Sequence, residues 1–379
     1  MALNDLRVLD LSRLLPGPYC SMMFADFGAD VIKIESIDGD PARLDPLISD
    51  EKQAMFHSLN RNKRSLCLDL KSPEGSNHFL KLVKEADVVI ESFRPGVMDR
   101  LGIGYETLKS ENKRLVYCAI TGYGQSGPDR TKAGHDVNFI SRAGMLDLSG
   151  HAGEKPVIPP AQIGDIGGGG LLAFSGIMIA LHERDRTGVG QFVDISMLDG
   201  ALSWMQTSLP QYLSSGAQES RGELPLSGSL ACYETYETKD NRWFAVGALE
   251  PKFWRLFCEQ IDRPDLISRQ TGDAAVQREV KREVQREFHK RSFQEWSAIF
   301  ANSDACVTPV ATFAEMTKDP QVVHREMIQD DAPSGRTIAQ PIRLSETPAR
   351  VRTGAPALGE HTEQIIQHGW VHRNASVKE

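Results

Sequence analysis

The chain has 379 residues, of which 40% are hydrophobic and 25% are charged, and its formal net charge is −8. This length and composition are typical of a globular protein with a large core and room for two domains. The negative charge argues against nucleic acid as a partner, because binding to a phosphate backbone requires a basic surface. A polyanionic ligand would therefore have to be met by a local group of cations.

Cysteine usage and apolar runs bear on the compartment. The six cysteines are scattered, with no CxxC pair and no histidine cluster. We therefore expect no metal site and no disulfide framework. The first strand-like run begins at Arg7, which leaves no room for a signal or transit peptide, and the longest apolar run, 171–181, is too short to span a bilayer. We expect a cytoplasmic protein with no membrane partner.

The first part of the chain alternates strand-like and helix-like stretches. RVLDL, from Arg7, precedes a turn with Pro16, Gly17 and Pro18, a helix-length stretch and the run VIKIE. LCLDL, a helix candidate over 75–86, DVVIES and RLVYCAI follow. This order predicts the α/β class, with a Rossmann-like parallel sheet and crossover helices. Ligands of such a sheet bind beyond the carboxyl ends of its strands.

A dinucleotide site is one alternative for this sheet. The sequence GYGQSG, with Gly122, Gly124 and Gly127, matches G-x-G-x-x-G after a strand-like run. The motif should open a helix, but Pro128 and a polar stretch without apolar periodicity follow it. We therefore interpret GYGQSG as a loop.

The second part of the chain predicts a separate small domain. A strand and a helix follow Gly190, and a Ser- and Gly-rich stretch comes next. CYETYETKDNRWFAVGALE then reads as a hairpin turning at Asp240-Asn241, and the mixed charges of 278–291 indicate a solvated helix face. The predicted division is a large domain over 1–207, a linker over 208–226, a small α+β domain over 227–308, a return linker over 309–340, and a segment over 341–379 that rejoins the large domain.

The stretch QIGDIGGGGLLAFSGIMIALHERDRTGVGQFVDISM, from Gln162, carries the first candidate for chemistry. Asp165 stands at the mouth of a four-glycine run, Gly167 to Gly170, ahead of a helix-length apolar segment. Small residues let a ligand approach the backbone, and the first N–H groups of a helix favour an anion. The carboxylate is either a helix cap or a reacting group beside a bound carbonyl.

His135, in AGHDVNF, is the second candidate. An imidazole and a carboxylate on opposite sides of a carbon acid can remove a proton on one side and return one on the other, with no metal or nicotinamide. The N–H groups at the start of the Gly167 helix would hold the enolate oxygen. The same residues also permit Asp165 to attack a thioester as a nucleophile. If both residues are structural, the glycine run is only a helix-packing device.

Several motifs together resemble one family. RVLDLSRLLPGPYCSMMFADFGADVIKIE, NRNKRSLCLDLKSPEG, ESFRPGVMDRLGIGYE, AGHDVNF, IGDIGGG and VGALEPKF occur in the order typical of the class III CoA-transferase (CaiB/BaiF) superfamily, and most closely of its α-methylacyl-CoA racemases. The resemblance runs from about residue 6 to about residue 257 and more weakly to the C-terminus. It implies two chains interlocked as rings in a homodimer, with each active site between the large domain of one subunit and the small domain of the other.

The resemblance also implies the site residues. The two acid/base groups are His135 and Asp165, with Glu250 of the G-A-x-E-P motif placed beside the histidine. Coenzyme A, as the thioester part of the substrate and not as a redox or metal cofactor, is met by a set carried over by position: Asp69, Leu70, Lys71, Arg94, Arg100 and Lys132. A group of cations is what a 3′-phosphate and a pyrophosphate require in an acidic protein.

Departures from the transferase pattern decide the expected reaction. Members that transfer CoA commonly have Gln where Leu15 stands, Glu where His135 stands, and a glycine-rich loop where this chain has VGALEPK. The approach to Asp165 is one residue shorter than in the best-known racemase type, which has an Asn that orients the Asp, so Gln162 is the candidate for that role. We expect racemisation or epimerisation of 2-methylacyl-CoA thioesters through an enolate. The alternatives are a CoA-transferase working through an acyl-Asp165 intermediate and an acyl-CoA binding protein without activity.

Overall fold

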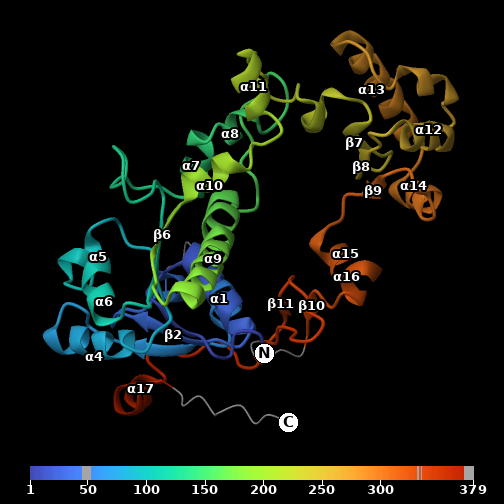
Figure 1. Ribbon diagram of the computed structural model, residues 1–379. Coiled ribbons are helices and arrows are strands. Elements are labelled where there is room, and N and C mark those ends of the chain that lie inside the picture. The colour runs from blue at the N-terminus through green and yellow to red at the C-terminus, as the bar shows by residue number, and fades with distance from the viewer. Residues whose placement is uncertain (45–52, 331–332, 334, 371–379) are drawn as a thin grey trace. The chain divides into compact units, whose positions relative to one another are not determined.

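The computed structural model describes residues 1–44, 53–330, 333 and 335–370. The chain divides into two compact units (Figure 1). The first unit comprises 1–143, 160–204 and 320–379, and the second comprises 144–159 and 205–319. Each unit has its own hydrophobic core.

A six-stranded parallel sheet with strand order β3-β2-β1-β4-β5-β6 forms the centre of the first unit. The strands are β1 (Arg7–Asp10), β2 (Asp30–Glu35), β3 (Arg64–Cys67), β4 (Val88–Glu91), β5 (Val116–Thr121) and β6 (Phe192–Ser196). This is the Rossmann-like α/β arrangement that the sequence predicts. The order reverses between β1 and β4, so the loops that follow these two strands diverge and leave a crevice for a ligand.

Helices cover both faces of this sheet, because neighbouring strand residues such as Val8 and Leu9 point to opposite sides. Figure 1 shows α4 and α17 on one side and α1 and α9 on the other. The helices of this unit are α1 (Pro16–Asp26), α2 (Pro41–Leu44), α3 (Ala54–Asn60), α4 (Pro73–Val83), α5 (Val97–Arg100), α6 (Tyr105–Glu111), α7 (Asp136–Arg142), the π-helix η1 (Ile163–Leu171), α9 (Leu172–Thr187), α10 (Met197–Ser203), α16 (Pro320–His324) and α17 (Thr362–His368). A short antiparallel pair, β10 (Ile328–Gln329) and β11 (Thr337–Ile338), lies near its end.

Three local predictions are corrected. The expected turn at Pro16 is the first turn of α1, because proline fits a helix start, where no N–H is needed. The third strand ends at Cys67, and the Asp69 carboxylate accepts the Lys71 N–H (2.9 Å) to turn the chain. The stretch from Ile163 to Thr187 is one 25-residue helix, longer than the apolar run considered above and apolar enough to cross a membrane. It packs against α1, α10 and the sheet, as a core helix does.

The second unit is an antiparallel sheet with helices packed on one face. Its elements are α8 (Met145–Leu148), α11 (Leu209–Ser215), an irregular turn η2 (Pro225–Ser229), β7 (Tyr233–Glu237), β8 (Trp243–Gly247), α12 (Pro251–Gln260), the 3-10 helix η3 (Pro264–Arg269), α13 (Ala274–Phe288), α14 (Phe293–Phe300), β9 (Val307–Pro309) and α15 (Phe313–Met316). In α13 the buried residues Val280, Val284 and Phe288 recur every four positions, which leaves the charged residues on the opposite face.

The structure differs from the predicted division in three places. Residues 144–159 belong to the second unit, and the predicted linker 208–226 contains α11, which Gly216 ends in the left-handed conformation (φ 67°). The predicted return linker 309–340 contains α15, α16 and the β10-β11 pair. Within the final segment, Ile365 of α17 is buried in the core of the first unit, and residues 371–379 lie outside the described residues.

Candidate active site

A pocket of about 560 Å³ opens in the first unit at the reversal point of the sheet. Its walls come from the loops after β1, β4 and β5, from the start of α10 and from the π-helix. Both His135 and Asp165 line it. Two residues that are 30 positions apart in the sequence therefore share one cavity, at the edge where ligands of such sheets bind.

His135 is placed by the start of α7. It is the residue that precedes the helix, and its backbone N–H donates a hydrogen bond to Asn138 Oδ1 at 3.0 Å. Such a bond closes the first turn of a helix. The imidazole is exposed and lines the pocket. The loop after β5 and this cap thus hold the side chain at the cavity wall, where it can exchange a proton with a ligand.

Asp165 lies in the first turn of the π-helix. Burial, and after it the nearby Asp136 carboxylate, together raise the pKa of its carboxyl to about 7. The backbone N–H of Asp165 donates to Asp136 Oδ1 at 3.0 Å. Near neutral pH the Asp165 carboxyl is therefore divided between its protonated and ionised forms, as a group that both gives and takes protons should be.

The glycine run has a different role from the one predicted. Gly167 to Gly170 lie inside the π-helix, which begins four residues earlier at Ile163, so the prediction that Gly167 opens a helix is wrong. A Cβ at Gly168 would lie 2.9 Å from the Ala201 backbone nitrogen, and one at Gly170 would lie 2.6 Å from the Pro16 carbonyl oxygen. The glycines let the helix pack closely against α10 and α1. N–H donors for an oxyanion must come from the turn that starts at Ile163.

Gln162 does not orient Asp165 in the structure. Its side chain is exposed, and its amide nitrogen donates to the Pro160 carbonyl oxygen at 3.4 Å. The hydrogen bond that ties Asp165 to a second segment is the one its backbone N–H donates to the carboxylate of Asp136, which follows His135 in the chain. In the sequence, the only indication of this hydrogen bond was the presence of an aspartate at the end of the AGHD motif.

The predicted CoA residues fall into two groups. Arg94 and Lys132 line the pocket. Lys132 Nζ lies 2.6 Å from Asp129 Oδ1 in an ion pair. Four other predicted residues do not line the pocket: Asp69, Leu70 and Lys71 follow β3, two strands from the reversal point, and Arg100 ends α5.

Two cations of the pocket were missed by sequence reasoning. Arg13 follows β1, and its guanidinium carbon lies 5.0 Å from the centre of the Phe93 ring, which also lines the cavity. Arg130 belongs to the loop after GYGQSG. The sequence did offer one indication of this role for Arg13, because a cation directly after the strand that borders the reversal point is placed to meet a ligand. With these two, the pocket wall carries four cations in a chain of net charge −8.

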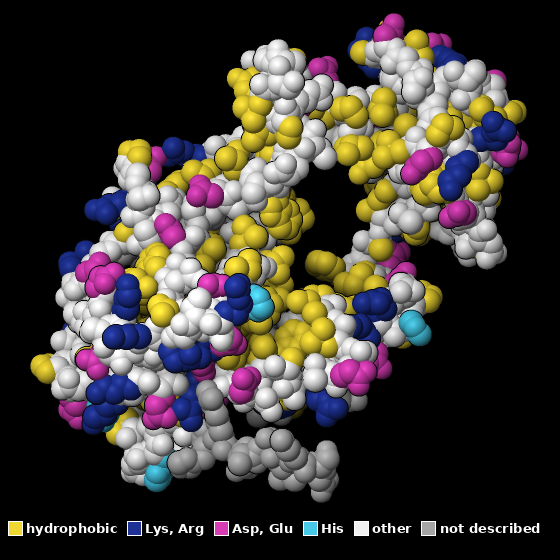
Figure 2. All heavy atoms as spheres, viewed as in Figure 1, with side chains coloured by type: hydrophobic (Ala, Val, Ile, Leu, Met, Phe, Trp, Pro, Cys, Tyr) yellow, Lys and Arg dark blue, Asp and Glu magenta, His cyan; other side chains and the backbone are white. Residues whose placement is uncertain are grey.

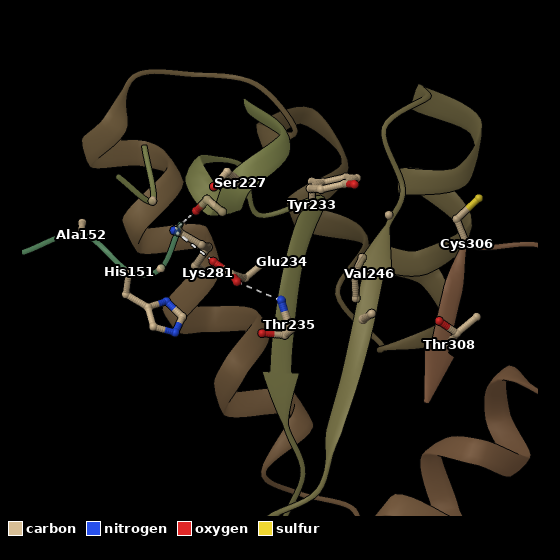
Figure 3. Close-up of a pocket in the computed structure, with 15 residues that line it drawn as sticks. His151, Ala152, Ser227, Tyr233, Glu234, Thr235, Val246, Lys281, Cys306 and Thr308 are labelled. Atoms are coloured by element: carbon tan, nitrogen blue, oxygen red, sulfur yellow. Dashed lines mark hydrogen bonds and ion pairs between the residues drawn. The ribbon is translucent and has the colours of Figure 1, made fainter. Parts of the chain in front are cut away.

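Glu250 lies in the second unit. It is the exposed residue that precedes α12, three residues after the end of the strand β8. The second unit also contains a cavity of about 760 Å³, lined by residues of its three strands, by Lys281 of α13 and by the segments 150–152 and 222–228 (Figure 3). At its polar end Lys281 Nζ donates to the Gly228 carbonyl oxygen at 2.5 Å and lies 3.4 Å from Glu234 Oε2. Its lining holds none of the predicted site residues. Among the described residues of both units, no group of three His, Cys, Asp or Glu is arranged to hold a metal ion.

Comparison with known proteins gives the family. The model of CoA-transferase family III matches residues 3–362. The α-methylacyl-CoA racemase of Homo sapiens is 37% identical over 97% of this chain and 93% of its own length, and the succinyl-CoA:mesaconate CoA-transferase of Haloarcula hispanica is 35% identical over 98% and 97%. The crystal structure of a CaiB/BaiF family protein from Brucella suis superposes with a TM-score of 0.84 at 32% identity, over 96% of this chain and 98% of that one. The chain is therefore a member of CoA-transferase family III.

Proposed function

We propose that this chain racemises or epimerises 2-methylacyl-CoA thioesters by proton transfer at the α-carbon, with His135 and Asp165 as the two acid/base groups. The observation that carries the proposal is that both side chains line one pocket at the reversal point of the sheet. The similarity to α-methylacyl-CoA racemases at 36–37% identity supports it.

The mechanism conserves protons. For one enantiomer, the neutral His135 removes the α-proton and the C–H electron pair moves into the thioester carbonyl to form an enolate. The protonated Asp165 carboxyl then delivers its proton to the opposite face of the α-carbon. The other enantiomer follows the reverse route, from ionised Asp165 and protonated His135. One proton is taken and one returned, so no other reactant is consumed.

The raised pKa of Asp165 favours this reaction over CoA transfer. A carboxyl that acts as a nucleophile must be ionised, and burial beside Asp136 works against that state. Leu15 also stands where transferases of the family commonly have Gln, and in this chain it packs with Met22, Met23 and Leu59. The alternative is a CoA-transferase that forms an acyl-Asp165 anhydride, because transferases are similar to this chain at 30–35% identity.

The four cations of the pocket support CoA as the handle of the substrate. A 3′-phosphate and a pyrophosphate would be met by the positive charges of Arg13, Arg94, Arg130 and Lys132. A guanidinium group can bind two oxygens of one phosphate at the same time. Asp69, Leu70, Lys71 and Arg100 stay in the proposal as contacts for the adenosine end, outside the cavity.

We also propose an interlocked homodimer, in which Glu250 of one subunit lies beside His135 of the other and pairs with its ring. Large apolar side chains are exposed on both units (Figure 2), among them Ile158, Ile179, Leu213 and Phe313, the last with 87% of its surface exposed. Apolar surface of this kind is typical of an interface between subunits. A cytoplasmic location belongs to the proposal as well, and the six unpaired cysteines support it.

The test is isotope exchange. A 2-methylacyl-CoA of defined configuration is incubated in heavy water with the protein and no acceptor acid. We expect α-deuterium uptake together with loss of optical purity, and neither in Asp165→Asn. CoA movement to an added carboxylic acid, with a hydroxylamine-sensitive adduct on Asp165, would instead establish the transferase. Binding without exchange or transfer would leave an acyl-CoA binding protein.

A further inference from the structure

Asp136 follows His135 in the chain but has no place in the mechanism above. Its side chain is buried, with 8% of its surface exposed, although it is the first residue of α7, a position that is commonly exposed on a helix. Its carboxylate oxygen Oδ1 accepts the Asp165 backbone N–H at 3.0 Å. The start of α7 and the first turn of the π-helix are thereby joined by one charged hydrogen bond, which is stronger than a neutral one.

Packing around this bond leaves little room for movement. A Cβ added to Gly164, the residue before Asp165, would lie 3.1 Å from Asp136 Oδ1 and 3.4 Å from the Phe139 Cβ atom. A side chain at Gly164 would therefore press against the Asp136 carboxylate, which would have to shift by a few tenths of an ångström. Since His135 and Asp136 are consecutive, any shift of Asp136 also displaces the imidazole.

The geometry points to Asp136 as the positioning residue of the proton-transfer pair: it ties Asp165 to the segment that carries His135 and places a negative charge beside the Asp165 carboxyl. The catalytic role of Asp136 rests on the proposed function. The hydrogen bond and the charge that Asp136 supplies are independent of that function. Gln162, the sequence candidate for orienting Asp165, has its amide turned to Pro160 instead.

The charges around Asp165 predict how a substitution at position 136 would change the pKa of the Asp165 carboxyl. Besides burial, Asp136 is the group that raises the pKa of Asp165. The elements packed against the π-helix, together with α9 that continues it, also carry titratable groups, among them Tyr19 and Cys20 on α1, Cys118 on β5, His182 on α9, Asp194 on β6 and Asp199 on α10, and His135 precedes α7. None of them is a cause of the raised pKa of Asp165. The cations of the pocket wall are Arg13, Arg94, Arg130 and Lys132. An uncharged residue at 136 should therefore let the Asp165 carboxyl ionise at lower pH.

Two substitutions separate the charge from the hydrogen bond. In Asp136→Asn the amide oxygen still accepts the Asp165 N–H, but the charge is gone. In Asp136→Ala both are gone. Asp194→Asn is the matched control, because Asp194 Oδ2 also accepts a backbone N–H, that of Gln125 at 3.1 Å, and burial also raises its pKa, yet it does not line the pocket.

The experiment measures the Asp165 carboxyl by carbon-13 NMR titration, with the signal assigned by its loss in Asp165→Asn, and the pH profile of α-proton exchange in the same proteins. In Asp136→Asn we expect the Asp165 pKa to fall by about one pH unit, the exchange profile to move with it, and the maximal rate to stay within several-fold of wild type. In Asp136→Ala we expect the same fall in pKa and at least a roughly tenfold lower maximal rate, from the lost hydrogen bond. Asp194→Asn should change neither.

The outcomes separate the two proposals. An unchanged Asp165 pKa in Asp136→Asn overturns the inference, and so does equal exchange in the Asn and Ala variants. If wild-type protein shows no exchange while the Asp165 pKa still falls in Asp136→Asn, the racemase proposal fails and the link between Asp136 and Asp165 stands. If Asp136→Ala does not fold, the titration and profile of Asp136→Asn decide the matter alone.

Discussion

Gly168 of the π-helix and Gly200 of α10 meet backbone to backbone: a Cβ atom added to Gly200 would lie 2.3 Å from the Gly168 carbonyl oxygen. No real Cβ atom is found so close to a carbonyl oxygen, so the two helices can cross at this distance only if both positions are glycine. The crossing sets the depth of the π-helix in the first unit and, through it, the place of Asp165 at the pocket wall.

Replacing Gly200 by alanine is expected to destabilise the protein, because backbone atoms on both helices would have to separate. The cost should be on the order of 1–3 kcal/mol, as for other overpacked sites. Thermal unfolding followed by circular dichroism measures it. Gly247→Ala is the control, since a Cβ there meets only the Cys306 carbonyl oxygen, at 3.9 Å. Equal melting temperatures of the two variants would contradict the packing role.

Asp165→Asn is expected to stabilise the protein at pH 8 but not at pH 4. The folded chain keeps this carboxyl protonated up to about pH 7, whereas the unfolded chain ionises it near pH 3.8, so the wild type loses stability as the pH rises between these values. Asparagine has no proton to lose. The gain at pH 8 should be on the order of 1–3 kcal/mol, and chemical denaturation at both pH values measures it.

A matched variant checks the cause of this effect. Burial raises the pKa of Glu91 to about 7 as well, and Glu91 does not line the pocket. Glu91→Gln should therefore show the same dependence of stability on pH and keep α-proton exchange, which Asp165→Asn should abolish. A stability gain of the same size at pH 4 and pH 8 would argue against titration as its source.

Arg13→Ala is expected to weaken CoA binding about tenfold, as the loss of one charged hydrogen bond to phosphate does. Isothermal calorimetry with free CoA measures the affinity, and the dependence of the affinity on salt should become shallower. Arg114→Ala serves as the control, because Arg114 is exposed, pairs with Asp185 at 3.6 Å and lies outside the pocket. Unchanged CoA affinity in Arg13→Ala would remove this cation from the binding site.

Chains with His135→Ala and chains with Glu250→Ala are expected to restore activity when they are expressed together. If each site takes His135 from one subunit and Glu250 from the other, a mixed dimer has one site with both substitutions and one with neither. With random pairing, half of the dimers are mixed and each mixed dimer has one intact site. Two variants that are inactive alone should therefore give about one quarter of the wild-type exchange rate. Exchange no higher than that of the separate variants would show that Glu250 does not act across subunits.

Local patterns in the sequence were sufficient for the sheet. Runs such as RVLDL and VIKIE place apolar residues at neighbouring positions because these strands are buried on both faces, and β1 and β2 lie where the runs predict them. The family motifs around His135 and Asp165 likewise pointed to residues that line one pocket. These features depend on side chains close together in the chain, which is the information that a single sequence carries.

Contacts between distant segments were not accessible in the same way. Arg13 lines the pocket because of the order of the strands in the sheet. The hydrogen bond between Asp165 and Asp136 forms because two residues 29 positions apart in the chain are brought together. The glycine run reads equally well as a ligand-facing loop and as a close helix crossing, because glycine suits both. The sequence by itself determined the fold class and the family, and it named His135 and Asp165 as the candidate acid/base pair. Only the tertiary structure decided which cations line the cavity and what holds Asp165, because those interactions exist only once separate elements have packed.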